Sequence, residues 1–244
     1  MVSIDVIVNL GKPRVYTPLI VRKQMERIKL SDECSHNSIN LVYIVPVKGG
    51  ELASHHEKLA GIISKIAKIL NVHVEILYNT NDKGLSHGRN LGILHSKSEV
   101  IAYIDDDAIP SHSWIKRLRY IFDRDKKLVG VFGRVKPIFI DNCNMCQKIP
   151  EEFYWIFSCT PSYFPTKTQI FYRGFGTNMA FRRRILYNIG GFRMGLGEGS
   201  TKGKWVGGED TELALRLCSR GYKVVFDPDL IVYHIINQGR CILN

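Results

Sequence analysis

The chain has 244 residues, 45% of them hydrophobic, which suits one large α/β domain with a well-buried core. Its 34 lysines and arginines exceed its 23 aspartates and glutamates, and the formal net charge of +11 predicts attraction to anions. No apolar run approaches the roughly 18 residues that span a bilayer. The first residues also lack the basic leader and apolar core of a signal peptide, so we expect neither a membrane-spanning nor a secreted protein.

The cysteines are scattered along the chain. Of the six, only Cys143 and Cys146 form a CxxC pair, and no second pair follows at the spacing of a zinc site. Scattered thiols in a chain of this size favour a reducing, cytoplasmic compartment.

Strand-like and helix-like segments alternate in the first half of the chain. Residues 52–70 carry an apolar stripe at helical spacing, and residues 41–47 form a short apolar run typical of a buried strand. This alternation predicts a mainly parallel sheet with helices on both faces. We expect strands at 4–8, 41–47, 72–78 and 100–104, and helices at 19–30, 52–70, 86–96 and immediately after Ser113.

The second half is less regular. Residues 134–176 are rich in proline and aromatic residues without clean periodicity, which predicts loops and a smaller irregular lobe. The glycine-rich stretch 197–208 predicts a mobile loop. A helix should then run from residue 209 to a stop at Gly221, and two short strands, 224–226 and 230–233, should flank a DPD turn.

Three consecutive aspartates follow the strand predicted at 100–104. Ligands of parallel sheets bind at the carboxyl ends of the strands, where these carboxylates would lie. Asp105 and Asp107 would point to one side of the extended chain and Asp106 to the other. Asp105 and Asp107 could therefore share a hard cation such as Mg²⁺ or Mn²⁺. Taken alone, the triplet also fits a solvated acidic turn.

Two further stretches carry candidate chemistry. In WVGGEDTEL, Glu209 and Asp210 stand at a helix start, where the helix dipole favours carboxylates; simple N-terminal capping is the alternative. In NDKGLSHGRN, a loop with Lys83 and Gly84 leads into a helix that carries Arg89, an arrangement suited to anions. An ordinary strand-to-helix connection is the alternative here.

The order of these stretches resembles the GT-A-fold glycosyltransferases of family 2. GLSHGRNLGI precedes the aspartates, GTNMAFRRRILYNIGGF (176–192) and GGEDTELALRL follow them, and DPDLIVYH (227–234) closes the pattern. The resemblance covers residues 80–235 well and residues 1–79 only by the order of strands and helices. It implies a single GT-A (Rossmann-like) domain over residues 1–244, with a nucleotide-sugar-binding half at 1–133 and an acceptor-side half at 134–244.

On the donor side, the resemblance implies a role for each matching residue. Asp105 would lie near the nucleotide ribose and share a divalent metal, Mn²⁺ or Mg²⁺, with Asp107. His234 would add a further metal contact. Arg89 would bind the donor, together with Lys83 and Gly84.

On the acceptor side, Asp210 would be the general base that deprotonates a hydroxyl group. Glu209, Trp205 and Asn178 would bind the acceptor, a glycan or a lipid-linked saccharide. The implied activity is inverting transfer of a sugar from a nucleotide-sugar donor. A carboxylate base opposite the leaving diphosphate and a cation to neutralise its charge suit that chemistry.

The chain departs from the family pattern after the second strand. An acidic segment that recognises the base usually follows there, whereas this sequence reads VPVKGG, with Pro46, Val47 and Lys48. Base recognition is therefore altered, and uridine cannot be assumed. A second alignment makes residues 42–50 the first strand and its following turn and leaves 1–40 as an added segment. We prefer the alignment that keeps four strands before the aspartates.

Two other functions compete with this interpretation. A sugar-phosphate nucleotidyltransferase would use the same kind of sheet, and NLGKPR (9–14) faintly echoes its glycine-rich basic signature. A basic module that binds nucleic acid or an anionic membrane would explain the charge but not the carboxylates at 105–107 and 209–210. We expect no specific nucleic-acid partner, and assign the charge to an anionic acceptor or to the membrane surface that carries it.

Overall fold

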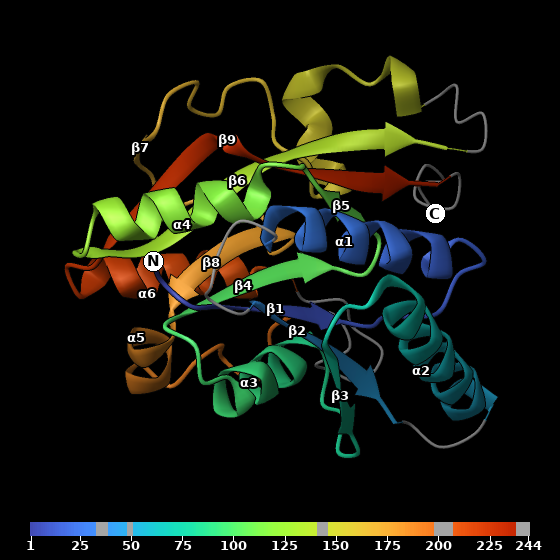
Figure 1. Cartoon of the computed structure of the whole chain (residues 1–244). Coiled ribbons are helices and arrows are strands. Elements are labelled where there is room, and N and C mark those ends of the chain that lie inside the picture. The colour runs from blue at the N-terminus through green and yellow to red at the C-terminus, as the bar shows by residue number, and fades with distance from the viewer. Residues whose placement is uncertain (33–38, 48–50, 141–145, 198–206, 238–244) are drawn as a thin grey trace.

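A computed structural model describes residues 1–32, 39–47, 51–140, 146–197 and 207–237 (Figure 1). The first half contains β1 (Ile4–Asn9), α1 (Thr17–Asp32), β2 (Ile39–Pro46), α2 (Glu51–Leu70), β3 (Val74–Asn79), α3 (Leu85–His95) and β4 (Val100–Asp105). The second half contains β5 (Ala108–Pro110), α4 (Trp114–Arg124), β6 (Leu128–Phe139), the 3₁₀ turns η1 (Cys146–Lys148) and η2 (Glu151–Phe157), β7 (Gln169–Ile170), β8 (Asn178–Arg182), α5 (Arg183–Asn188), α6 (Glu209–Ser219) and β9 (Lys223–Ile236).

The strands form one sheet in the order β3-β2-β1-β4-β8-β6-β9-β5, and the short β7 pairs with β9. Strands β1 to β4 run parallel, and β8 runs antiparallel to both of its neighbours, β4 and β6. The arrowheads of β4, β6 and β9 consequently point to the same edge of the sheet (Figure 1). This arrangement confirms the predicted α/β fold with a mainly parallel sheet.

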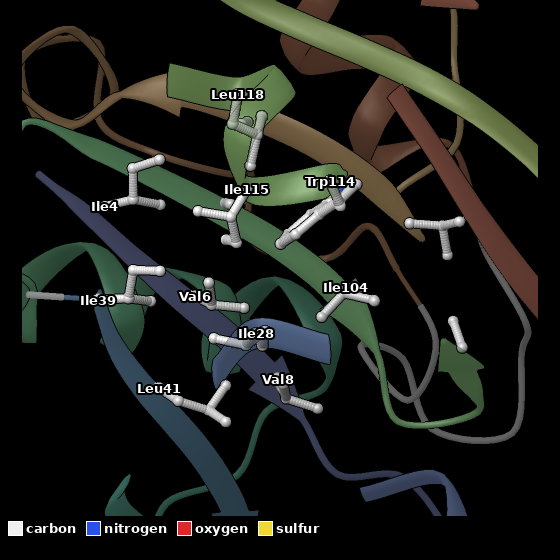
Figure 2. Packing of buried hydrophobic residues seen from close by; sticks show 14 of the residues in the cluster. Ile4, Val6, Val8, Ile28, Ile39, Leu41, Ile104, Trp114, Ile115 and Leu118 are labelled. Carbon is white, nitrogen blue, oxygen red and sulfur yellow. The ribbon is translucent and has the colours of Figure 1, made fainter. Parts of the chain in front are cut away.

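Helices cover both faces of the sheet because the strands are apolar on both. In β1, Val6 and Val8 belong to the core under α1, α2 and α4, whereas Ile7 belongs to the core under α3, α5 and α6. Figure 2 shows the first of these cores, where Trp114 and Leu118 of α4 lie close to β1 and β4. Each such side chain contributes about 2 kcal/mol by leaving water.

The parallel strands place their last residues side by side. Asn9 at the end of β1 lies opposite Asp105 at the end of β4, and Pro46 at the end of β2 lies opposite Asn79 at the end of β3. The four strands expected before the aspartates are present, and β1 lies between β2 and β4. The alignment that keeps residues 4–8 as the first strand therefore agrees with the topology.

The second half is more regular than the sequence predicted. Residues 134–139, expected in a loop, extend β6, and the two strands expected around the DPD turn are one strand, β9, with a break in register. The break lies where Asp227 pairs with Gly133 and Ile231 with Arg134. Asp227 stabilises the break, because its buried carboxylate accepts hydrogen bonds from the backbone N–H groups of Asp229 and Leu230.

Two of the predictions from composition can be compared with the described residues. None of the helices there is long and apolar enough to cross a membrane. Cys159 and Cys218 form no disulfide, whereas Cys146 is disulfide-bonded. The reducing, cytoplasmic compartment stays an expectation from the sequence.

Candidate active site

Three candidate metal ligands gather at the carboxyl end of β4. Asp105 ends β4, Asp107 lies in the turn before β5, and His234 lies in β9 opposite Ala108 of β5. One ligand atom from each of the three residues lies within 4.8 Å of the other two. The backbone N–H of Ile235 donates to the carbonyl of Asp107 and ties the turn to β9. The sheet thus brings together residues separated by more than a hundred positions.

The imidazole of His234 is oriented for a cation. It is buried, with Nδ1 2.9 Å from the carbonyl oxygen of Phe157 and Nε2 3.0 Å from Oδ1 of Asp107. A carbonyl only accepts, so Nδ1 carries the proton in this contact. In the neutral ring the lone pair of Nε2 then faces a carboxylate, and a cation bound between them would relieve the repulsion. The donor set of two carboxylates and an imidazole fits Mn²⁺ or Mg²⁺.

Two further contacts, one of Asp106 and one of Asp107, involve the segment after β1. Nη1 of Arg14 lies 2.5 Å from Oδ2 of Asp107, and the backbone N–H of Gly11 donates to Oδ2 of Asp106. Burial and the neighbouring charge of Asp107 raise the pKa of Asp106 to about 7. Asp106 is therefore turned toward the β1–α1 segment, away from the cluster that Asp105 forms with Asp107 and His234.

A buried arginine joins this cluster to α6. Arg89, 2% exposed, donates from Nη1 to Oε1 of Glu209 at 2.5 Å, and its Nη2 lies 3.8 Å from Oδ1 of Asp105. Burial disfavours the charged guanidinium, but the surrounding carboxylates outweigh it and raise the pKa of Arg89. A Cβ at Gly176 would fall 2.3 Å from Nη2, so the guanidinium fits only against a glycine. Arg89 is thus buried among carboxylates of the site, and the donor contact predicted for it stays a prediction.

The carboxylate of Asp210 is fixed at the start of α6. The helix follows Gly208, whose φ of 90° lies in the left-handed region. Oδ2 of Asp210 accepts from the backbone N–H of Gly176 at 2.8 Å, and Oδ1 accepts from that of Thr211 at 2.6 Å. Burial and the charge of Glu209 raise the pKa of Asp210. The residue is half-buried rather than fully enclosed.

The segment before β8 connects the two groups of carboxylates. Gly176 holds Asp210, and Oγ1 of the next residue, Thr177, donates to Oδ2 of Asp105 at 2.6 Å. The contacts of Gly176 and Thr177 were not predicted from the sequence, nor was the contact of Arg14 with Asp107, although the segments 9–14 and 176–192 were noted there. A glycine and a threonine do not by their type indicate that they hold the carboxylates of a site.

A cavity of about 320 Å³ opens beside the cluster at the carboxyl ends of β1 to β4. Its walls include Asn9, His56, Asn79 and Asp82, together with the three aspartates. Three buried atoms on these walls have no hydrogen-bond partner, namely Oδ1 of Asn9, Nδ1 of His56 and Oδ1 of Asn79. Nε2 of His56 faces the carbonyl of Gly11 and must donate, which leaves Nδ1 as an acceptor.

Unpaired buried acceptors are costly, by about 1–3 kcal/mol each. A ligand that donates hydrogen bonds could satisfy such acceptors where they border the cavity. The polar edge of a nucleobase carries N–H donors of this kind.

The remaining predicted site residues differ in whether they line the cavity. Gly84 lines the cavity, and its N–H donates to Oδ1 of Asp82 at 3.0 Å, whereas Lys83 is exposed and is not part of the lining. Asn178 is fully buried, and its amide is bonded to the side chain of Trp114 and to two backbone carbonyls. We therefore leave Asn178 out of the acceptor contacts proposed below. Trp205 lies outside the described residues.

The sequence of the chain matches a family model and a curated protein. The sequence model described as Glycosyl transferase family 2 matches residues 53–190, which is more than half of the chain. A glucosyl-dolichyl phosphate glucuronosyltransferase of Haloferax volcanii is 28% identical over 164 residues, covering 66% of this chain and 51% of that protein. The chain thus spans about half the length of this curated relative.

Two solved structures share the fold. A mannosyltransferase from Pyrobaculum calidifontis, in complex with GDP-Man and Mn²⁺, superposes with a TM-score of 0.63 at 16% identity, over 96% of this chain and 56% of that one. The enzyme GalNAc-T7, with UDP, GalNAc and Mn²⁺, superposes with a TM-score of 0.65 at 19% identity, over 96% of this chain and 44% of that one. At these identities the likeness establishes the GT-A architecture.

Proposed function

Since the chain belongs to glycosyl transferase family 2, we propose that it is a metal-dependent, inverting glycosyltransferase. It moves a sugar from a nucleotide-sugar donor to a hydroxyl group of a glycan or lipid-linked saccharide. The observation that carries this proposal is the connection of two carboxylate groups through one buried arginine. Asp105, with Asp107 and His234, lies on one side of Arg89, and Glu209, with Asp210, lies on the other.

The donor half supplies the diphosphate site. Asp105, Asp107 and His234 would hold Mn²⁺ or Mg²⁺, which when bound neutralises the charge that develops on the leaving diphosphate. Thr177 fixes the carboxylate of Asp105 from the other side. Arg14 lies against Asp107 and carries a positive charge at the mouth of the same cavity.

The nucleotide would occupy the cavity at the ends of β1 to β4. The acid expected after the second strand is missing, but His56 of α2 and Asn79 of β3 line this region, and each has a buried acceptor atom without a partner. These atoms support recognition of the base through its N–H groups. Lys83 is exposed beside Gly84 and would contribute charge rather than a fixed contact.

Asp210 would act as the base. Its two oxygens are held by the backbone of Gly176 and Thr211, so the carboxylate is oriented before the acceptor binds. The raised pKa of Asp210 brings the group closer to neutral pH, where a base accepts a proton most effectively. A direct attack by the deprotonated hydroxyl on the sugar carbon, opposite the diphosphate, inverts the configuration there.

Glu209 would align the acceptor side of the site through its ion pair with Arg89. The acceptor itself is proposed from two observations. The relative from Haloferax volcanii acts, by its name, on a glucosyl-dolichyl phosphate, and this chain carries a net charge of +11. A lipid-linked saccharide at an anionic membrane surface would satisfy both.

Calorimetric titration tests the donor half of this proposal. Nucleoside diphosphates of each base are added with and without Mn²⁺, and we expect one of them to bind at least tenfold more tightly with the metal. Transfer from the matching sugar nucleotide is then followed by NMR, where an α-linked donor should give a β-linked product. Equal affinities with and without Mn²⁺, or release of pyrophosphate from a nucleoside triphosphate and a sugar phosphate, would contradict it.

A further inference from the structure

A second and larger cavity, of about 610 Å³, lies between α1 and the ends of β5, β6 and β9. In Figure 1, α1 runs beside β5 at the edge toward which β4, β6 and β9 point. The walls of this cavity are mostly apolar, with Ile20 from α1, Ile109 from β5, Ile138 from β6 and Ile235 from β9. Of these four residues, Ile235 also contacts the site described above, through the bond from its backbone N–H to the carbonyl of Asp107.

The cavity and the metal cluster share two strands. Ala108 of β5 pairs with His234 of β9, and Ile109 pairs with Tyr233. Side chains alternate along a strand, so His234 points to the cluster while Tyr233 and Ile235 point to the cavity. A molecule bound in the cavity would lie on the opposite side of the paired strands β5 and β9 from Asp107.

Two cationic side chains line the cavity. Lys23 and Arg27 lie one turn apart on α1, and the described lining includes no acidic residue. Lys23 pairs with Glu26 at 3.0 Å, and its side chain is 45% exposed. An apolar cavity with cations in its lining complements a molecule with a hydrocarbon chain and an anionic head.

We propose that this cavity binds the hydrocarbon chain of a phosphate-bearing lipid, with the phosphate against Lys23 and Arg27. Resting on the proposed function, this lipid is the carrier of the acceptor saccharide. Occupation of the cavity by a hydrocarbon chain would bury apolar surface of both partners, which is the driving force for binding. Phosphates are preferred partners of arginine and lysine. The cavity thus brings the lipid carrier to the edge where the donor binds.

Binding of an isoprenyl phosphate to the whole chain, without donor, tests this inference independently of catalysis. Farnesyl phosphate is titrated by calorimetry beside farnesol and inorganic phosphate. We expect farnesyl phosphate to bind at least tenfold more tightly than either of them. A diazirine at the end of the chain should label peptides that contain Ile109 or Tyr233.

Matched variants locate the site. Leu19 lines the cavity and is 59% exposed, so Leu19→Glu should fold, as its melting temperature will show, and weaken farnesyl phosphate binding at least tenfold. Ile69→Glu, at a 79% exposed position of α2 away from the cavity, should leave binding unchanged. Lys23→Gln with Arg27→Gln should reduce the preference for the phosphate over farnesol, whereas Lys58→Gln on α2 should not.

Several results would overturn the inference. These are equal binding of inorganic phosphate and farnesyl phosphate, equal binding by Leu19→Glu and the parent chain, and labelling confined to other peptides. Dissociation of a dimer by Leu19→Glu in sedimentation would show that a second copy covers the cavity instead. The donor and metal titrations are separate measurements, so a failure of the proposed function shows there even if the lipid binds.

Discussion

Arg89 of α3 donates to Glu209 of α6 at 2.5 Å, and both side chains are buried. The contact joins helices 120 residues apart in the chain and fixes the start of α6, where Asp210 follows Glu209. Asp105 lies on the other side of the same guanidinium, 3.8 Å from it. One arginine therefore sets the spacing between the metal cluster and the candidate base.

Removing Arg89 should have two effects, a lower free energy of unfolding and a lower turnover. Arg89→Met leaves the carboxylate of Glu209 buried without its partner, and we expect a loss of about 3–5 kcal/mol in the free energy of unfolding. Turnover should fall as well, because Asp210 loses its fixed position. Denaturant unfolding and kcat measure the two effects.

The double variant Arg89→Met with Glu209→Met separates them. With both charges gone, most of the stability should return, while turnover should remain low. A double variant that is as unstable as Arg89→Met alone would show that the ion pair is not the source of the loss.

The metal cluster makes a second prediction. Asp107→Ala should abolish the Mn²⁺-dependent part of nucleotide binding while the fold survives, because the variant removes a ligand and also relieves repulsion among three carboxylates. Calorimetry with and without Mn²⁺ measures this. Asp229→Ala, at a side chain 72% exposed and outside the cluster, is the matched control and should bind as the parent does.

Local sequence patterns were sufficient for the first half of the fold. Buried parallel strands are continuous apolar runs, so β1, β2 and β4 could be located from them, along with the aspartates at and after the end of β4. The partly exposed β3 was located from the order of strands and helices. The strand β8 could not, because it has five residues and owes its place to antiparallel partners on both sides. The extended part of β6 contains Pro137 and exposed residues, and its pairing with β9 decides its conformation.

The site was predictable in its acidic groups but not in their connections. Asp105, Asp107, Glu209 and Asp210 stand out because carboxylates are adjacent at the end of a strand or the start of a helix. The role of Arg89 depends on packing with α6, and the three unpaired atoms of the donor cavity appear only once β1, α2 and β3 meet. Contacts over such separations are set by tertiary packing and leave no local pattern.

The donor cavity makes a third prediction. Asn79→Leu removes one of the buried acceptors while keeping the size of the side chain, and should lower the affinity for the preferred nucleoside diphosphate about tenfold. The difference in affinity between the preferred nucleoside diphosphate and the other nucleoside diphosphates should decrease at the same time. Calorimetry with each nucleoside diphosphate measures both. Asn188→Leu, at an exposed position of α5, is the control, and an unchanged preference in Asn79→Leu would remove this residue from base recognition.

Glu209 gives a prediction with a different kinetic signature. Glu209→Gln keeps the shape of the side chain but weakens its bond to Arg89, so the acceptor side of the site loses alignment. We expect KM for the acceptor to rise more than kcat falls. Steady-state kinetics at saturating donor measure this, and a change confined to kcat would instead assign Glu209 to the chemical step.

The final prediction concerns Asp210. Asp210→Asn should keep donor binding nearly intact and lower turnover by roughly 10²–10⁴-fold, the loss expected when a general base is removed. The amide is nearly isosteric but has one acceptor oxygen in place of two, so it can keep only one of the bonds from the N–H groups of Gly176 and Thr211. We expect the free energy of unfolding to fall by about 1–3 kcal/mol, which denaturant unfolding measures separately from turnover. Single-turnover rates at saturating donor measure the effect.

The pH dependence of the same step gives an independent check on Asp210. A base acts only when it is deprotonated, so turnover should rise with pH through the pKa of Asp210. Because burial and Glu209 raise that pKa, the rise should lie at higher pH than for an ordinary aspartate. In Asp210→Asn this acidic limb should disappear from the residual rate. A parent enzyme whose turnover is flat from pH 4 to pH 7, or a variant that keeps the limb, would assign the titration to another group and reopen the choice of base.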